Sequence, residues 1–392
     1  MSELSNKSVV FTGFLDFKKL RTKGFPRALR HIADSIWFGD STMTNLGNLE
    51  SIGGDVYFYD SKVESLGKLR VVRGSLNLDR SQVADLGALE VIGTDADFRE
   101  SQMVSTGKLR VIGGDAIFGI REPVRPGNNS IKPCSLETLG NLESIGGDAK
   151  FGYTSIADLG KLRTIGGNAN FTCARVTSLG NLESIGGDAK FGSYALADLG
   201  QLSIIGDNAD FAGSALVTLG NLKRIGGSAN FRDANYLISL GNLESIGRHA
   251  NLNYTNVLNL GELRSVGLGL DLGKTKISSL DKLEDVGGDL DLSDSEATDL
   301  GSLRKVGGSL KLGGTKVTSL GKLEQVGMDL SIRDSGVTDL GALRVIGRDF
   351  YVSPGQLEKM SGVEVVGEND ESTVVGTVRF SGLERIGGNI YN

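Results

Sequence analysis

Histidine and cysteine are the side chains most often used for metal binding and nucleophilic catalysis, and this chain of 392 residues has two of each. A metal site needs ligands at suitable spacing, and a catalytic triad needs a nucleophile beside a base and an acid. His31 and His249 lie far apart in the sequence, and Cys134 and Cys173 are isolated from both. We therefore predict that the protein is not an enzyme and has no metal site and no cofactor.

Aspartates recur about every twenty residues in one column, and carboxylates are ligands that calcium prefers. The column contains Asp55, Asp95, Asp115, Asp148, Asp188, Asp289, Asp329 and Asp349. Ser75, Asn168, Ser228 and Gly269 interrupt it, and His249 also occupies it. The interruptions favour hydrogen bonds to the local turn backbone over a row of calcium sites. His249 is accordingly expected to have a polar role at a turn.

A second column alternates between acidic and basic residues. It reads Glu50, Arg70, Glu90, Arg110, Glu143, Arg163, Glu183, Ser203, Lys223, Glu244, Arg264, Glu284, Arg304, Glu324, Arg344 and Glu364. A slip by one repeat would bring like charges together, so the alternation favours one register. We interpret the column as a solvated ladder of salt bridges and the ancestral unit as 40 residues long.

Both columns belong to a 20-residue repeat, which is marked by a Leu-Gly-x-Leu sequence. The first residue of this sequence is called the marker position. The marker position falls at Leu46, Leu66, Leu86, Thr106, Leu139, Leu159, Leu179, Leu199, Leu219, Leu240, Leu260, Leu280, Leu300, Leu320 and Leu340. A fixed period of this length indicates a solenoid, whose units stack because none can bury its apolar face alone. The alternation Asp289-Leu290-Asp291-Leu292 is typical of a strand with one buried face. We predict a mainly β repeat solenoid with one strand per coil in a parallel sheet.

The segment before each marker leucine predicts a capped turn. An N-cap type of residue (Asn, Asp, Ser or Thr) precedes the marker in every unit, as Asn45, Ser65 and Asp85 do. A short helical or 3₁₀ turn is expected to start there. It would end at the glycine column that includes Gly53 and Gly93, where a positive φ is easily adopted.

The stretch Leu310-x-Leu312-x-x-Thr315-x-Val317-x-x-Leu320-x-x-Leu323 is similar to the core motif of the leucine-rich-repeat superfamily. The resemblance covers residues 28 to 352. The chain departs from the family where a hydroxyl residue such as Thr315 replaces asparagine, and where Val306 lies one residue further upstream. The repeats also resemble receptor L-domain β-helical repeats. A right-handed leucine-rich-repeat horseshoe and a straighter β-helix both remain open, and the short coil favours the straighter form.

Irregularities divide the chain. Residues 1–27 have the apolar density of an N-terminal cap, residues 28–358 form the repeat solenoid, and residues 359–392 form degenerate C-terminal repeats and a cap. An insertion at 119–135 predicts a partner-contact loop or a neutral decoration. One added residue near Asn235 and Tyr236 predicts a β-bulge. The uncapped last strand predicts a homodimer formed through the C-terminal end.

The leucine-rich-repeat resemblance implies binding of a partner, usually a protein, along the outward strand face. The predicted contact residues on strands and in the insertion loop are Tyr57, Asn77, Asp97, Lys150, Asn170, Lys190, Asp210, Asn230, Arg121, Arg125 and Lys132. We therefore interpret the chain as a non-catalytic scaffold for protein–protein interaction. A carbohydrate-binding or adhesive module is the first alternative. An acidic nucleic-acid mimic is the second, against which the alternating charge column argues.

Charge and hydropathy narrow the remaining possibilities. The formal net charge is −6 and no lysine- or arginine-rich block is present, so we expect no nucleic acid and no membrane insertion. No stretch reaches the roughly 20 apolar residues of a membrane helix, and no secretory signal is recognised. Cys134 and Cys173 are not on adjacent units, which predicts free thiols. The expected location is cytoplasmic, or exported without a cleaved signal peptide.

Overall fold

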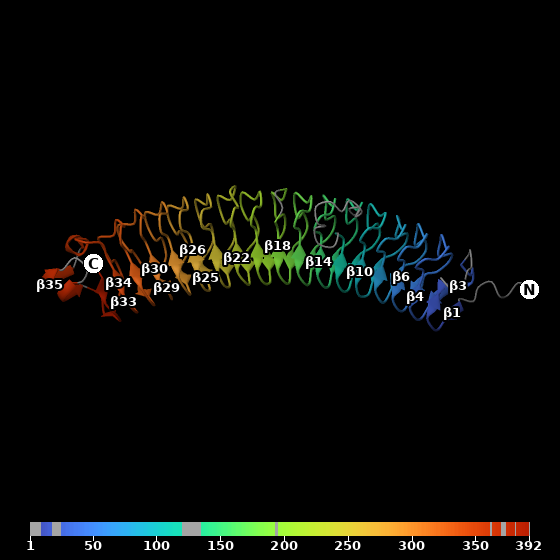
Figure 1. Cartoon of the computed structure of the whole chain (residues 1–392), viewed down its shortest axis with the longest axis horizontal. Helices are drawn as coiled ribbons and strands as arrows, with labels where there is room; N and C mark the ends of the chain where they lie inside the picture. The colour runs from blue at the N-terminus through green and yellow to red at the C-terminus, as the bar shows by residue number, and fades with distance from the viewer. Residues whose placement is uncertain are drawn as a thin grey trace, which may run out of the picture. The chain divides into compact units, whose positions relative to one another are not determined.

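The computed structural model describes residues 9–17, 25–119, 135–192, 195–360, 363–369, 374–380 and 382–391. The chain is a parallel β-solenoid of about 16 turns of about 20 residues, which confirms the predicted fold class (Figure 1). It divides into unit 1, residues 1–205, and unit 2, residues 206–392. In the described part of the chain, no helix is long and apolar enough to cross a membrane.

Each coil contributes two short parallel strands, so the prediction of one strand per coil was wrong. In the coil that holds Ser144–Ile145 and Ala149–Lys150, the chain bends at Gly146 and Gly147. The bend lets Ile145 and Ala149 both face inward while belonging to different ladders. The glycine pair therefore splits what we had interpreted as one continuous strand.

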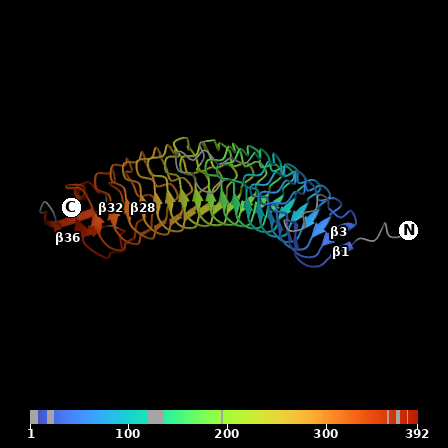
Figure 2. The ribbon, with the colours of Figure 1, turned by 45° about the vertical axis from the view of Figure 1, so that its right-hand side comes forward.

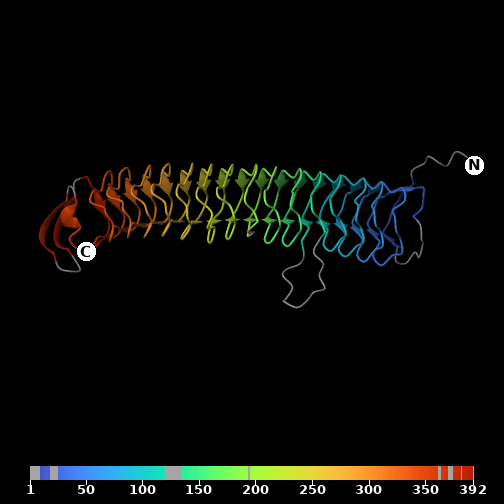
Figure 3. The ribbon, with the colours of Figure 1, turned by 90° about the horizontal axis from the view of Figure 1, so that it is seen from above.

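Unit 1 has two ladders of strands, which are seen separately in Figure 3. The first ladder contains β1 (Val9–Phe11), β3 (Leu29–Ile32), β5 (Ser51–Ile52), β7 (Val71–Val72), β9 (Val91–Ile92), β11 (Val111–Ile112), β13 (Ser144–Ile145), β15 (Thr164–Ile165), β17 (Ser184–Ile185) and β19 (Ile204–Ile205). The second contains β2 (Leu15–Asp16), β4 (Ile36–Trp37), β6 (Val56–Tyr57), β8 (Leu76–Asn77), β10 (Ala96–Asp97), β12 (Ala116–Ile117), β14 (Ala149–Lys150), β16 (Ala169–Asn170) and β18 (Ala189–Lys190). Residues of one sequence column lie opposite each other, as Ile145 does to Ile165.

Unit 2 repeats this arrangement, and Figure 2 shows β28 and β32 in one ladder. Its first ladder contains β21 (Arg224–Ile225), β23 (Ser245–Ile246), β25 (Ser265–Val266), β27 (Asp285–Val286), β29 (Lys305–Val306), β31 (Gln325–Val326), β33 (Val345–Ile346) and β37 (Arg385–Ile386). Its second contains β20 (Ala209–Asp210), β22 (Ala229–Asn230), β24 (Ala250–Asn251), β26 (Leu270–Asp271), β28 (Leu290–Asp291), β30 (Leu310–Lys311), β32 (Leu330–Ser331), β34 (Phe350–Tyr351) and β38 (Ile390–Tyr391).

The cores consist of the predicted columns. In unit 1, Phe118, Phe151 and Phe171 are fully buried and stack with ring centroids 5.0 and 4.9 Å apart. In unit 2, Leu292 and Leu312 occupy the same column and are also fully buried. The larger Leu replaces Ala on the preceding inward position there, so the volume is conserved as close packing requires.

The turn at the marker is capped as predicted, but it is not helical. The Asn45 Oδ1 accepts a hydrogen bond from the Gly47 N–H at 3.1 Å, and the Leu49 N–H closes the turn on the Leu46 carbonyl. Gly47 has φ 58°, a left-handed value that ends any helical path. The 3₁₀ segment in the described residues is η1 (Leu357–Lys359), which lies outside the regular repeats.

The glycine column that follows the first strand has another role than we predicted. Gly53 and Gly93 are not at positive φ. A Cβ on Gly93 would lie 2.0 Å from the Arg73 carbonyl oxygen of the preceding coil, and one on Gly53 would lie 2.1 Å from the Ala33 oxygen. Glycine is favoured there because adjacent coils approach closely, and not because of backbone conformation, although Arg73 occupies the same column.

The charge column forms ion pairs between coils, each from an arginine to the glutamate of the following coil. The pairs are Arg30–Glu50, Arg70–Glu90, Arg110–Glu143, Arg163–Glu183, Arg264–Glu284, Arg304–Glu324 and Arg344–Glu384. The Arg110 guanidinium donates to the Glu143 carboxylate and lowers its pKa. The constant direction of pairing supports a 40-residue unit.

The C-terminal irregularity differs from the degenerate repeat we expected around Val363. Strands β35 (Val363–Asn369) and β36 (Val374–Phe380) form an antiparallel hairpin. The ladders then resume, because β37 pairs with β33 and β38 pairs with β34. Glu384, and not Glu364, therefore occupies the charge column beside Arg344.

The added residue near Asn235 forms a turn, so the predicted β-bulge was wrong. The Leu237 N–H donates to the Ala234 carbonyl at 3.1 Å, and this turn lies between β22 and β23. The extra residue is absorbed outside the ladders because each strand is only two residues long.

Candidate functional site

The outward side chains of the second ladder form the face that we predicted to bind a partner, called here the ladder-2 face. Within each strand the first residue points into the core and the second points out, as Ala149 and Lys150 do. The structure places all the predicted strand residues on this face: Tyr57, Asn77, Asp97, Lys150, Asn170, Lys190, Asp210 and Asn230. Arg121, Arg125 and Lys132 lie outside the described residues.

Most of the asparagine and aspartate side chains on this face cap their own chain reversal. The Asn170 Oδ1 accepts the Thr172 N–H at 2.9 Å, and the Asp271 Oδ1 accepts the Gly273 N–H at the same distance. Asn77, Asp97, Asp210, Asn230, Asn251 and Asp291 make the same bond to the residue two positions later. These side chains close Asx turns, so the recurrence of Asn and Asp along this column of the repeat has a structural reason.

Sequence reasoning missed this role, although Asn or Asp recurs at this position in many coils, as Asn77 and Asn230 show. In the structure, the third residue after the strand is at positive φ in many coils, as Arg80 and Asp233 are. Such a position follows a tight reversal, which an Asn or Asp before it favours. The column was mixed enough to be interpreted as a variable binding surface.

Lys150 and Lys190 are different, because they are exposed and make no hydrogen bond or ion pair with any described residue. They lie two coils apart on either side of Asn170. A hollow of about 200 Å³ on this face is lined by these three residues and by Asp148, Asn168 and Asp188. The two ammonium groups are therefore free to meet a negatively charged partner.

The aspartate column that includes Asp148 and Asp188 holds adjacent coils together. The Asp148 Oδ1 accepts the Asn168 N–H of the next coil at 2.7 Å, and the Asn168 Oδ1 accepts the Asp188 N–H at 2.7 Å. We had expected hydrogen bonds within the local turn, and the bonds instead run from coil to coil. Among the residues that the structure describes, no three His, Cys, Asp or Glu side chains are grouped to hold a metal ion.

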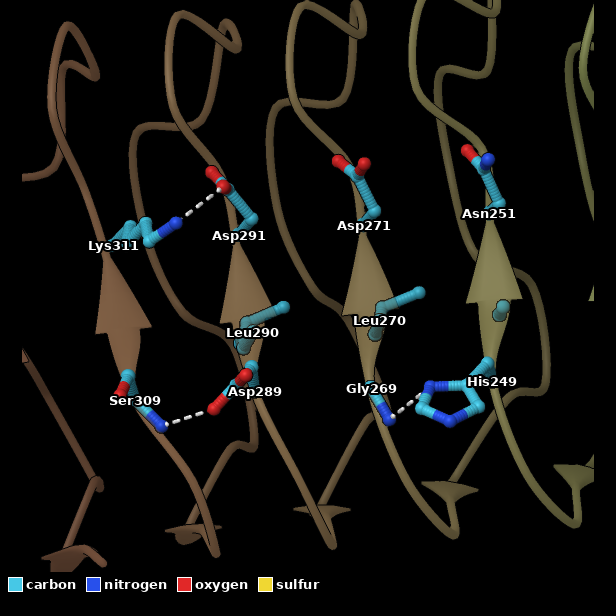
Figure 4. Close-up of a pocket in the computed structure, with 11 residues that line it drawn as sticks. His249, Asn251, Gly269, Leu270, Asp271, Asp289, Leu290, Asp291, Ser309 and Lys311 are labelled. Atoms are coloured by element: carbon cyan, nitrogen blue, oxygen red, sulfur yellow. Dashed lines mark hydrogen bonds and ion pairs between the residues drawn. The ribbon is translucent and has the colours of Figure 1, made fainter. Parts of the chain in front are cut away.

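A second hollow, of about 320 Å³, lies on the ladder-2 face of unit 2 (Figure 4). His249 Nδ1 accepts the Gly269 N–H at 3.2 Å, which agrees with the polar turn role we predicted. Lys311 Nζ lies 3.4 Å from Asp291 Oδ2. Burial acts to raise the pKa of Asp291, but the hydroxyl and N–H of Ser293 and the Lys311 ammonium together lower it below its ordinary value. Lys311 pairs with Asp291, and Asp271 and Asp289 also line the hollow, so the carboxylates outnumber the ammonium group there.

The hydroxyl residues in the column of Thr315 are mostly buried and point inward. Thr154, Thr255, Thr275 and Thr315 donate to the carbonyl three residues earlier, each at 2.7 or 2.8 Å. These hydroxyls are therefore used within the coil and are not presented to a ligand.

One pair of potentially catalytic side chains meets across coils of the first ladder. His31 Nδ1 lies 2.8 Å from Ser51 Oγ. Within the described residues, no carboxylate bonds to the other ring nitrogen of His31, so the group that would orient a catalytic histidine is missing. Cys173 is an exposed free thiol, and Cys134 lies outside the described residues.

Comparisons with known proteins add little. No family model matches the chain, and no curated protein matches it. A search of solved structures finds a leucine-rich repeat protein from Bacteroides ovatus at 15% identity and a TM-score of 0.25. The match covers 86% of this chain and 82% of the other chain.

Proposed function

We propose that this chain is a non-catalytic scaffold that binds a protein with an acidic surface through the ladder-2 face of unit 1. The observation that carries the proposal is the pair Lys150 and Lys190, exposed and without a polar partner in the described structure. We also propose that the chain is a divergent member of the leucine-rich-repeat superfamily, on the motif around Leu310 and Leu312.

The geometry suits an ionic contact. Neighbouring coils in a parallel ladder lie about 4.8 Å apart, so two coils separate the lysines by about 10 Å along the face. Asn168 and Asn170 lie between them, and Asn168 takes part in the bonds that join the coils. Ladder pairing fixes the backbone of both lysines, so binding orders only their side chains, at a cost of about 0.5 to 1.5 kcal/mol each, and the ionic attraction also speeds association.

A charge-reversal experiment tests the proposal. The chain is immobilised, partners are captured from an extract of the source cells, and the captured protein is purified for titration. The variant Lys150→Glu with Lys190→Glu should weaken binding roughly tenfold or more, which is about 1.4 kcal/mol per factor of ten. Since ionic contacts are screened, the wild-type affinity should also fall as salt rises.

The matched control is Lys108→Glu with Lys161→Glu. These lysines are also exposed and also two coils apart, but they lie in the marker turns and not on the ladder-2 face. Their reversal should leave the affinity unchanged. Equal binding by both double variants would refute the proposed site.

The insertion at 119–135 belongs to the same proposal as a second contact. Deletion of residues 120–132 would separate the two contacts, because Lys150 and Lys190 remain in place. Unchanged capture of partners by the deletion variant would remove the loop from the proposal and leave the face.

A carbohydrate-binding role has one specific observation in its favour. Two aromatic pairs lie on the ladder-2 face. In unit 1, Trp37 and Tyr57 are tilted with ring centroids 5.2 Å apart, and in unit 2, Tyr351 and Tyr391 are stacked with centroids 5.0 Å apart. Such rings combine an apolar body with a polar edge, which suits the mixed faces of a sugar. Binding on a glycan array that is lost with Trp37→Ala and Tyr391→Ala would favour this function over protein binding.

A further inference from the structure

Exposed apolar side chains gather on another part of unit 2, away from the ladder-2 face. Val217, Ile238 and Leu258 occupy one column of three successive coils and are 47%, 43% and 48% exposed. We call these three residues the apolar stripe. Tyr236 and Tyr254, 65% and 67% exposed, belong to two of the same coils. Clusters of this kind on a protein surface mark interaction sites.

Within unit 2, the aliphatic residues of this column end at Leu258. The next four coils have hydroxyl residues in the same column, namely Ser278, Thr298, Thr318 and Thr338. Large aliphatic side chains are therefore not needed for the fold at this position. One coil of the stripe also carries an added residue, which no other regular repeat of unit 2 has. The added residue lies in the turn at Ala234–Leu237, and this turn presents Tyr236.

The backbone of the stripe is already paired. The Ile238 N–H donates to the Val217 carbonyl at 3.0 Å, and the Leu258 N–H donates to the Ile238 carbonyl at 2.9 Å. Asn256 Nδ2 donates to the Asn235 carbonyl at 2.8 Å and ties the two coils together. A partner strand could not add to these occupied groups, so a partner must bind through side chains.

The spacing of the stripe fits an α-helix lying along the coil axis. Its outer members are two coils apart, about 9.6 Å at 4.8 Å per coil. Positions i and i+7 on one face of a helix are about 10.5 Å apart at 1.5 Å per residue. Apolar anchors at i, i+3 or i+4, and i+7 would therefore meet Val217, Ile238 and Leu258 in turn.

Basic residues lie in the coil beside the stripe, and acidic residues, Asp294 and Glu296, follow in the next coil. The coil after Leu258 carries Lys274, Lys276 and Lys282. Lys274 Nζ donates to the Tyr254 hydroxyl at 2.7 Å, and Lys282 pairs with Glu262. Lys276 is exposed and makes no ion pair with any described residue. A partner whose helix carries acidic residues at the end over this coil would be complementary to it.

We infer that the apolar stripe, with Tyr236, Tyr254 and Lys276, binds the apolar face of an acidic amphipathic helix of a partner protein. This site is separate from the ladder-2 face, so the chain would hold two partners or two parts of one partner. It is independent of the proposed function, since neither Lys150 nor Lys190 contributes to it.

The test uses the full chain and a defined probe. An 18-residue fluorescent helical peptide with leucine at i, i+3, i+4 and i+7 and glutamate at its ends is titrated by anisotropy. Saturable binding is expected, and Ile238→Ser with Leu258→Ser should weaken it roughly tenfold or more. Lys276→Glu should weaken it several-fold and reduce its dependence on salt.

Controls distinguish the stripe from general stickiness. Val104→Ser removes a valine that is 54% exposed in the same column but in unit 1, and it should leave the affinity unchanged. A peptide of the same composition with the leucines scrambled should not bind. Equal binding of the scrambled peptide, or no effect of the Ile238 and Leu258 changes, would overturn the inference. Stripe-dependent self-association, or stripe-dependent binding to phosphatidylserine vesicles without peptide binding, would assign the surface to another occupant and would also overturn it.

Discussion

The close approach of coils at the glycine column predicts that one methyl group separates a damaging substitution from a harmless one. A Cβ at Gly186 would lie 2.1 Å from the Gly166 carbonyl oxygen, whereas a Cβ at Gly192 would meet nothing nearer than Thr172 at 3.9 Å. Neither glycine is at positive φ. Gly186→Ala and Gly192→Ala are therefore a matched pair that differ in contact between coils and not in backbone strain.

The magnitude for Gly186→Ala follows from what must move. The overpacked contact costs about 1 to 3 kcal/mol. The bonds from the Gly186 and Gly187 N–H groups to the preceding coil, both 2.9 Å, would stretch at a cost of about 1 kcal/mol each. The reduced entropy of the unfolded chain returns about 0.4 to 1 kcal/mol. The net loss is about 2 to 5 kcal/mol, while Gly192→Ala should stabilise by about 0.4 to 1 kcal/mol.

Urea unfolding followed by circular dichroism measures both variants against the wild type. The expected result is a lower midpoint for Gly186→Ala and an unchanged or slightly higher midpoint for Gly192→Ala. Equal midpoints for the two variants would refute the argument, because the coils would then not be held at the spacing that excludes a side chain.

Three further predictions concern other parts of the frame. Thr315→Val removes the hydroxyl bond to the Leu312 carbonyl and should lower the free energy of unfolding in urea by about 1 kcal/mol. The buried Oγ of Ser295 has no partner in the described structure, so Ser295→Ala should change that free energy by less than about 0.5 kcal/mol. A larger loss for Ser295→Ala than for Thr315→Val would contradict this assignment of hydrogen bonds. The Ser319 hydroxyl and the Gly341 N–H lower the pKa of Asp339, so its contribution to stability is present above the unfolded-state pKa of about 3.9 and is lost as pH falls through the lower folded-state pKa. The stability difference between wild type and Asp339→Asn should therefore shrink between pH 6 and roughly pH 3, and a pH-independent difference would show that the two bonds do not favour the charged form. Finally, Ile386 and Ile390 of the last coil are only partly buried, so light scattering should detect a dimer as concentration rises, and a monomer at all concentrations would exclude pairing through the C-terminal end.

The core of this fold could be predicted from the sequence because it follows from one-dimensional periodicity. The Leu142 and Ile145 columns recur at a fixed period and are buried, as expected. Periodicity does not encode how the chain bends between Ile145 and Ala149, so two strands were interpreted as one. It also cannot distinguish a glycine needed for φ, such as Gly47, from one needed for space, such as Gly93.

The candidate site was predictable in position but not in detail. The outward placement of Asn170 and Lys150 follows from strand alternation. Their different roles depend on the chain reversal after the strand, where Asn170 bonds to the Thr172 N–H and Lys150 has no such partner. The apolar stripe was not recognised because Ile238 and Leu258 occupy a column whose orientation only the three-dimensional coil defines.

Lysine-selective acetylation of the chain, alone and with its captured partner, tests the central proposal most directly. Mass spectrometry reports the modification of Lys150, Lys190, Lys108 and Lys161 in one experiment. Binding through the ladder-2 face of unit 1 predicts that the partner protects Lys150 and Lys190 and leaves Lys108 and Lys161 as reactive as before. Protection of Lys108 and Lys161, with Lys150 and Lys190 still reactive, would contradict it.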